Sequence, residues 1–99
     1  MEKDGLLINI KQDNNNIIIS LCNKSNYEMI IYLIDITILT NNCSSISKLY
    51  NNNQVKNLKS QDTYIISFSY KRKYNIDTAI ISTIHHNNGI TIFDPIDLP

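Results

Sequence analysis

The sequence has 99 residues, enough for one hydrophobic core and too few for a second domain. Nine acidic and nine basic residues give a net charge of zero, so attraction of the whole molecule to nucleic acid or to an anionic membrane is not expected. No apolar run approaches the ~20 residues of a membrane-spanning helix, and the N-terminus lacks the basic and apolar regions of a signal peptide. The sequence therefore predicts one soluble, cytoplasmic domain.

The composition is skewed toward isoleucine and asparagine, with twenty Ile and fifteen Asn against two Gly, two Pro and no Trp. Ile, Asn, Lys and Tyr all have AT-rich codons, so the skew indicates a low-GC gene. The asparagines are therefore weak evidence for prion-like behaviour. The shortage of glycine excludes a phosphate-cradling loop and a dinucleotide-binding motif.

The first half of the chain alternates between strand patterns and polar turns. Residues 6–11 place apolar side chains on one face and polar side chains on the other, as a strand with one wet face does. A turn at 13–16 leads to a second strand at 17–22, and a turn at 23–26 follows. The longest apolar run, 28–39, is rich in β-branched residues and predicts the central strand of a sandwich, with every even position from 30 to 38 apolar.

The polar stretch 40–62 is the part whose path is least defined by its pattern. A structureless loop of this length is unusual in a compact domain, so two short edge strands are expected around 47–50 and 54–57, where the chain crosses between sheets. Residues 63–70 again place every second side chain on one apolar face, which predicts a strand, and another strand is expected at 78–85.

The Asn88-Gly89 pair is the strongest hairpin signal in the chain, because both central residues of a type I′ turn need a positive φ. The last strand, 90–94, is expected to pair back across this turn. Proline cannot donate a hydrogen bond to a ladder, so pairing is expected to end at Pro95 and to leave 95–99 as a C-terminal arm outside the main ladders.

About seven or eight short strands and no long helix predict an all-β fold, a small antiparallel β-sandwich formed by residues 1–99 as a single domain. In strand number and length the layout resembles immunoglobulin-like sandwiches. The chain lacks the Cys…Trp…Cys core of immunoglobulin domains, since it contains no tryptophan.

Catalytic and metal-binding chemistry find little support in the sequence. His85 and His86 are neighbours on a strand and point to opposite faces, so they are not expected to share a metal ion. Cys22 and Cys43 fit no metal-binding pattern, and they are either free thiols or a disulfide. An enzyme, a cofactor and a metal site are therefore not expected.

A small, neutral β domain without catalytic motifs is most simply a binding module. Its size and composition are similar to those of immunity proteins, which neutralise bacterial toxins, so we expect a cytoplasmic inhibitor that covers the active site of one cognate protein. The partner would be a secreted toxin domain, or a nuclease with a basic groove that carboxylates complement. The candidate contacts combine carboxylates with aromatic anchors. They are Asp94, Asp97, Asp77, Glu28, Tyr70 and Tyr74.

The alternative hypothesis is a single-stranded nucleic-acid or accessory binding module. The 70–74 loop combines three cations, Lys71, Arg72 and Lys73, with two tyrosines. Cations bind phosphates and aromatic rings stack on bases. A solvated turn has a similar composition, so the loop alone does not decide between the two functions.

Overall fold

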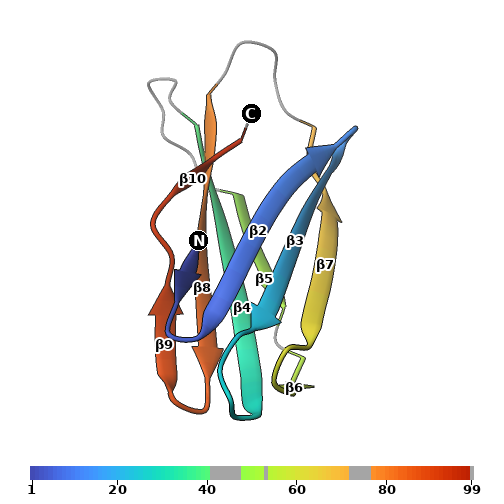
Figure 1. Ribbon diagram of the computed structural model, residues 1–99. Coiled ribbons are helices and arrows are strands. Elements are labelled where there is room, and N and C mark those ends of the chain that lie inside the picture. The colour runs from blue at the N-terminus through green and yellow to red at the C-terminus, as the bar shows by residue number, and fades with distance from the viewer. Residues whose placement is uncertain (41–47, 53, 72–76, 99) are drawn as a thin grey trace.

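The computed structural model describes residues 1–40, 48–52, 54–71 and 77–98, with the backbone alone described at 48–52. These residues form ten strands and no helix, and the strands pack as two antiparallel sheets (Figure 1). The strands are β1 (Glu2–Lys3), β2 (Leu6–Asp13), β3 (Asn16–Asn23), β4 (Met29–Thr40), β5 (Lys48–Asn52), β6 (Lys56–Leu58), β7 (Thr63–Ser69), β8 (Thr78–His86), β9 (Gly89–Ile92) and β10 (Ile96–Asp97). The predicted antiparallel sandwich is confirmed.

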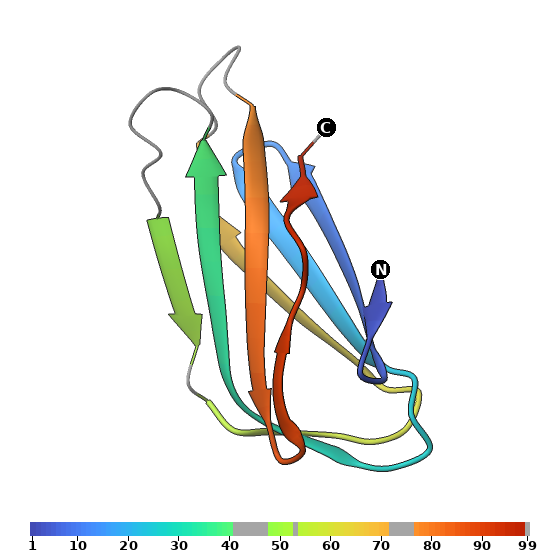
Figure 2. The same ribbon diagram turned by 90° about the vertical axis from the view of Figure 1, so that its left-hand side faces the viewer.

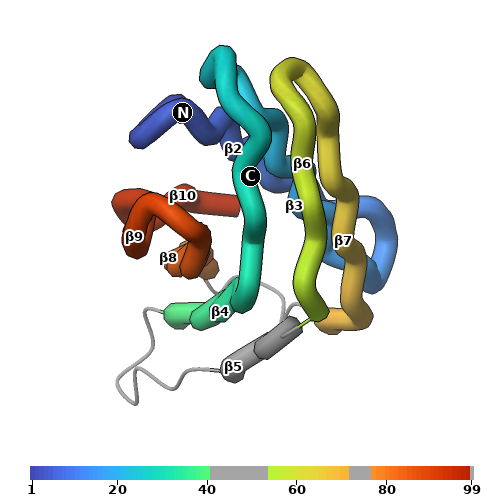
Figure 3. Tube along the Cα trace, turned by 90° about the horizontal axis from the view of Figure 1, so that it is seen from below, coloured from blue at the N-terminus to red at the C-terminus, as the bar shows by residue number. Residues whose placement is uncertain are grey.

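One sheet has the order β1-β2-β3-β7, and the other has the order β10-β8-β4-β5, with β6 also paired to β4 and β9 to β8. Figure 2 shows the two sheets as separate layers. The view from below shows the chain crossing between the layers after β3 and again after β6 (Figure 3). In the described residues no helix is long and apolar enough to cross a membrane.

Alternating apolar residues of both sheets fill the space between the layers. On β3, Ile17, Ile19 and Leu21 are completely buried, as expected from their spacing. Across the core, β8 contributes the equally buried Ile80 and Ile84. Large, regularly spaced β-branched side chains therefore account for the core, because each strand turns one face inward.

The central strand β4 differs from its prediction in one respect. Met29 and Ile31 are buried, but beyond them the buried positions are the even ones, beginning with Ile34. The register between β4 and β8 shifts between Ile31 and Leu33, which marks a β-bulge. The extra residue reverses the inward and outward alternation, so Tyr32, expected on the even apolar face, is 46% exposed. The central position of the strand itself is confirmed.

One hairpin turn also differs from expectation. In the β8–β9 hairpin His86 pairs with Gly89, so the turn residues are Asn87 and Asn88, not Asn88 and Gly89. Gly89 has a φ of 130°, whereas neither asparagine has a positive φ, which excludes a type I′ turn. The type I′ pattern occurs instead at Asp4 and Gly5, with φ of 53° and 81° between β1 and β2. The hairpin was predicted correctly and its turn type was wrong.

The C-terminal segment belongs to the second sheet. Ile96 and Asp97 form β10 and pair with Ile80 and Ala79 of β8. The Leu98 amide then donates a hydrogen bond to the Thr78 carbonyl at 2.8 Å. The prediction that pairing ends at Pro95 was therefore wrong, because proline only interrupts the ladder between β9 and β10.

The two short strands expected between 40 and 62 are present as β5 and β6. Both pair with β4 in the same sheet, so the chain does not cross between sheets at β5. It crosses after β6, where the Gln61 amide bonds to the Asn23 carbonyl and the Asn23 amide bonds to the Asp62 carbonyl. These bonds join the second crossing to the end of β3.

Candidate functional site

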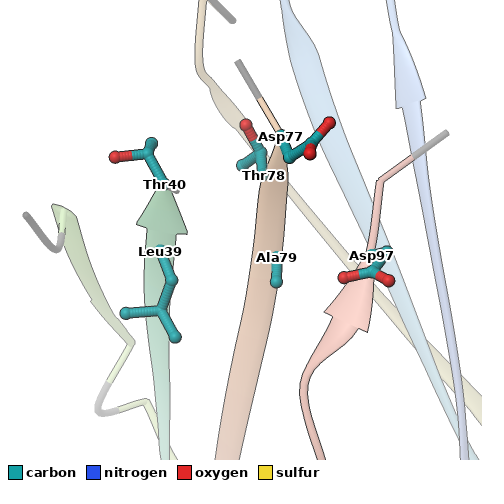
Figure 4. A pocket seen from close by; sticks show the side chains of 6 residues that line it. All are labelled: Leu39, Thr40, Asp77, Thr78, Ala79 and Asp97. Carbon is teal, nitrogen blue, oxygen red and sulfur yellow. The ribbon is translucent and has the colours of Figure 1, made fainter. Parts of the chain in front are cut away.

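Two of the predicted carboxylates line the same pockets, at the end of the sandwich where β8 begins. Asp77 immediately precedes β8, and Asp97 lies on the neighbouring β10 opposite Ala79. Both side chains are exposed. They line a pocket of about 170 Å³, whose lining is completed by Leu39, Thr40, Thr78 and Ala79 (Figure 4).

A second pocket of about 250 Å³ adjoins the first and is lined by Asp77, Thr78, Asp97 and Leu98. The two carboxylates therefore border both hollows, although 19 other residues separate them in the sequence. We call Asp77, Asp97 and these two pockets the acidic end. Its apolar floor and exposed carboxylates can accept a side chain that combines an apolar stem with a positive charge, such as lysine or arginine.

Asp94 lies on the same edge of the sheet, in the connection between β9 and β10. Phe93 before it is 1% exposed and Leu98 after it is 5% exposed, so this segment is held against the core. Asp94 and Asp97 are both exposed. The segment therefore closes the sandwich with its apolar residues and presents its carboxylates to solvent at the same time.

Glu28 is exposed but lies at the opposite end of the molecule, just before Met29 at the start of β4. The register of β4 and β8 pairs Thr40 with Thr78, so the acidic end lies where β4 finishes. Glu28 is thus separated from the acidic end by the whole length of β4. The four predicted carboxylates do not form one surface.

The predicted aromatic and basic contacts lie around the connection from β7 to β8. Tyr70 is half-buried, packs against the core, and its amide donates to the Asn15 carbonyl at 2.7 Å. Lys71 follows it and is exposed. Arg72, Lys73 and Tyr74 lie outside the described residues.

The two histidines point to opposite faces of β8, as expected for neighbours on a strand. His85 faces outward, with Nε2 3.4 Å from Oδ2 of Asp35. His86 is buried at 7% exposure. The described residues contain no cluster of three or more metal-ligating side chains.

His86 belongs to a chain of hydrogen bonds that the sequence did not reveal. Its Nδ1 accepts the Asn88 amide at 3.2 Å, and its Nε2 lies 2.8 Å from Oγ1 of Thr91. The Thr91 hydroxyl donates to Oδ2 of Asp4 at 2.8 Å. Nδ1 is thus an acceptor and Nε2 carries the proton, so a neutral imidazole satisfies every group in the chain. Burial lowers the pKa of His86, an effect that Asp4 opposes and His85 reinforces.

This chain of bonds ties the β1–β2 turn of one sheet to the β8–β9 hairpin of the other. The threonine hydroxyl is held by the carboxylate and is not oriented toward the imidazole as a nucleophile would be. The arrangement is therefore structural, and Asp4-Gly5 was the sequence signal that could have located it.

Cys22 is a free, half-buried thiol on β3, with Sγ 3.8 Å from the Gln61 carbonyl oxygen. Cys43 lies outside the described residues.

Comparison with known proteins shows similarity of fold alone. No protein-family model and no curated protein matches the sequence. Among solved structures, the chain is similar to red sea bream transglutaminase, with a TM-score of 0.59 and 9% identity over 98% of this chain and 17% of that one. It is also similar to the structural-genomics target SoR45, with a TM-score of 0.61 and 7% identity over 98% and 88% of the two chains.

A third similar structure is Spo0M, a sporulation control protein from Bacillus subtilis, with a TM-score of 0.50 and 8% identity over 94% of this chain and 48% of that one. The chain thus spans less than half of the transglutaminase and of Spo0M. At such low identity these likenesses show a β-sandwich and carry no statement about activity.

Proposed function

We propose that the chain is a protein-binding inhibitor that covers the active site of one basic partner, with the acidic end as the centre of the contact. The observation that carries this proposal is the convergence of the exposed Asp77 and Asp97 on shared pockets. Carboxylates in such an arrangement complement the cationic groove of a nuclease or of a secreted toxin domain. Occlusion requires no catalytic group of the inhibitor itself, and the acidic end can act through its carboxylates and the shape of its pockets.

The size of the molecule indicates how such a contact would extend. A stable interface buries ~800 Å² on each partner. The molecule measures 41 × 23 × 22 Å, so its end has a cross-section of about 500 Å². A partner seated on the acidic end must therefore also cover part of a flank. Asp94 lies on the flank next to Asp97, and we include it in the contact surface, whereas Glu28 at the far end is left out.

The test compares charge reversal at the two ends of the molecule. Wild-type protein, the double variant Asp77→Lys/Asp97→Lys and the control Glu28→Lys are immobilised and used to capture proteins from extract of the source organism. The captured partner is then produced alone, and its activity and affinity are measured with each variant. We expect the double variant to bind about a hundredfold more weakly or worse, because attraction becomes repulsion worth several kcal/mol. Glu28→Lys is expected to bind and inhibit as the wild type does.

A second set of variants separates this proposal from nucleic-acid binding. Changing Lys71, Arg72 and Lys73 to Gln should leave capture of the protein partner intact. If these changes instead abolish binding to a single-stranded oligonucleotide, and that binding weakens steeply with salt, the basic loop is the functional surface. If the Asp77→Lys/Asp97→Lys variant captures the partner as well as the wild type does, the inhibitor proposal is refuted.

A further inference from the structure

The outer edge of β7 carries backbone hydrogen-bonding groups that no other described strand takes up. β7 is the last strand of its sheet and pairs only with β3. Figure 1 shows β7 at the border of the fold, with no described strand of its sheet beyond it. An edge of this kind is a template for pairing with another strand.

The hydrogen-bond pattern identifies which residues face the edge. Tyr70 donates its amide to the Asn15 carbonyl, and these two residues continue the register of β7 and β3. Residues that exchange hydrogen bonds recur at every second position of an antiparallel pair, so Phe68, Ile66 and Tyr64 bond to β3. The backbone groups of Thr63, Ile65 and Ser67 must then point away from β3, toward the open edge.

The side chains of these three residues place no obstacle on the edge. All three are exposed on the outer face of the sheet, and Ile65 is 62% exposed. From Thr63 to Ser69 the strand contains no charge, proline or glycine, and its register with β3 is regular. The nearby Lys56 places Nζ 5.5 Å from the ring centroid of Tyr64, whose side chain belongs to the inner face. It therefore does not cover the outer face of Ile65 and Ser67.

Three other edge strands of the described sheets, β1, β9 and β10, are protected in ways that β7 is not. β1, at the far side of the same sheet, consists of only Glu2 and Lys3. On β9, the carbonyl of Ile92 is occupied by the Lys3 ammonium at 2.7 Å. β10 has two residues and follows Pro95. Short strands, prolines and lysines are the usual devices that prevent edge pairing, so their absence from a regular seven-residue strand marks it as a pairing edge.

We infer that β7 pairs antiparallel with β7 of a second copy of this chain, so that the two four-stranded sheets join into one. The register that uses all three edge residues pairs Ile65 with Ile65 of the second copy, and Thr63 with Ser67. Each pair then exchanges two hydrogen bonds. This two-fold arrangement brings no like charges together, since the strand is uncharged, and symmetric dimers are the commonest assemblies. A peptide bound at this edge would leave the chain monomeric, so the oligomeric state distinguishes it from a second copy.

Sedimentation equilibrium of the full chain tests this inference. The wild type should change from its monomer mass of 11.4 kDa toward twice that mass as the protein concentration rises to about 1 mM. Ile65→Lys places two lysines directly opposite each other at the symmetry axis, with their Cα atoms ~5.5 Å apart, and should weaken dimerisation at least tenfold. Ser67→Pro removes an amide that faces the edge and should have the same effect. The matched control is Ile90→Lys, at an isoleucine on β9 that is 57% exposed, which should leave dimerisation unchanged.

Amide hydrogen exchange provides an independent measurement in the wild type. The amides of Ile65 and Ser67 should exchange at least tenfold more slowly at high protein concentration than at low concentration. Those of Ile66 and Phe68, already bonded to β3, should not change. A wild type that stays monomeric up to about 1 mM would overturn the inference. So would a dimer that both Ile65→Lys and Ser67→Pro, folded by circular dichroism, leave intact.

Discussion

Asn23 is the buried polar residue whose replacement tests the packing of the fold most directly. Its side chain is fully buried at the end of β3. Nδ2 donates to the Tyr27 carbonyl at 2.7 Å and to the Leu58 carbonyl at 2.9 Å. Oδ1 accepts the amide of Ser25 at 2.9 Å and its hydroxyl at 2.6 Å. One amide group thus joins the end of β3, the turn before β4 and the end of β6.

Asn23→Asp keeps the shape of the side chain and replaces both donors by an acceptor. The buried Leu58 carbonyl loses its side-chain donor, which costs about 1–3 kcal/mol. The Tyr27 carbonyl also loses its side-chain donor, because the single Ser25 proton is donated to Oδ1. Tyr27 is exposed and its contact with Asn23 is only partly buried, so this loss is smaller, about 1 kcal/mol. We therefore expect the free energy of unfolding to fall by about 2–4 kcal/mol at pH 7, a large part of the 5–15 kcal/mol typical of a domain.

The pH dependence of this loss gives a second check. Burial beside two carbonyl oxygens raises the pKa of the introduced carboxyl above its unfolded value of about 4. A raised folded pKa means that the variant is least destabilised at low pH and loses stability as the pH rises through that pKa. A protonated carboxyl can still donate one hydrogen bond, which explains the partial recovery.

Urea unfolding of Asn23→Asp at pH 4 and at pH 7 measures both effects. The matched control is Asn26→Asp, the same chemical change at an exposed position of the same turn. Surface substitutions of this kind usually change stability by less than about 0.5 kcal/mol. If Asn23→Asp loses less than about 1 kcal/mol relative to Asn26→Asp at pH 7, the hydrogen bonds of Asn23 do not hold the two crossings together.

Three further predictions concern the core, the hairpin and pH. Ile34→Ala should lower the free energy of unfolding by about 2–5 kcal/mol in urea, because Ile34 is 1% exposed on the central strand; a loss below about 1 kcal/mol would contradict that position. Gly89→Val should cost about 1–3 kcal/mol from backbone strain alone, since φ is 130° and no atom lies within 4 Å of an added Cβ; unchanged thermal stability would contradict it. His86 has a folded pKa below 6.5, so the unfolded chain binds the proton more readily, and stability should be complete above about pH 6.5 and fall as the pH drops below it. Titration of stability in wild type and His86→Gln should show this decline only in the wild type.

The sandwich could be predicted because apolar side chains recur at every second position along its strands. A period of two places Ile17, Ile19 and Leu21 on one face whatever lies opposite them, so the core face of β3 follows from the local sequence. The same argument failed on β4. A bulge adds one residue without any special residue type to mark it, and the apolar run offered Tyr32 and Ile34 as equivalent positions.

The turn assignments show a similar limit. Asn88-Gly89 and Asp4-Gly5 carry the same hairpin signal, and only the second pair adopts it. In the first, the register of β8 and β9 places Gly89 opposite His86 and moves the turn back by one residue. This register accompanies the bonds of the buried Thr91 to His86 and Asp4, two residues that lie far apart in sequence. No local pattern contains that information.

The candidate site was predictable as single residues but not as a surface. Asp77 and Asp97 were chosen for their charge, and their meeting depends on β10 returning along β8 beyond Pro95. Glu28 satisfied the same chemical criterion and lies at the other end of β4. The edge formed by β7 could not be anticipated either, because its openness follows from the strand order of the whole sheet.

The proposed dimer and the proposed inhibitor surface make a joint prediction about stoichiometry. β7 runs toward the end of the sandwich where Asp77 precedes β8 (Figure 1). Antiparallel pairing of β7 with its copy therefore points the two acidic ends in opposite directions, so one partner molecule cannot contact both. Each copy should bind its own partner, with no gain in affinity from dimerisation. Titration calorimetry with the identified partner should give one partner per chain and the same affinity for wild type and Ile65→Lys. An affinity that falls with Ile65→Lys would mean that the partner itself occupies the β7 edge, and the two surfaces would then have to be reassigned to a single interface.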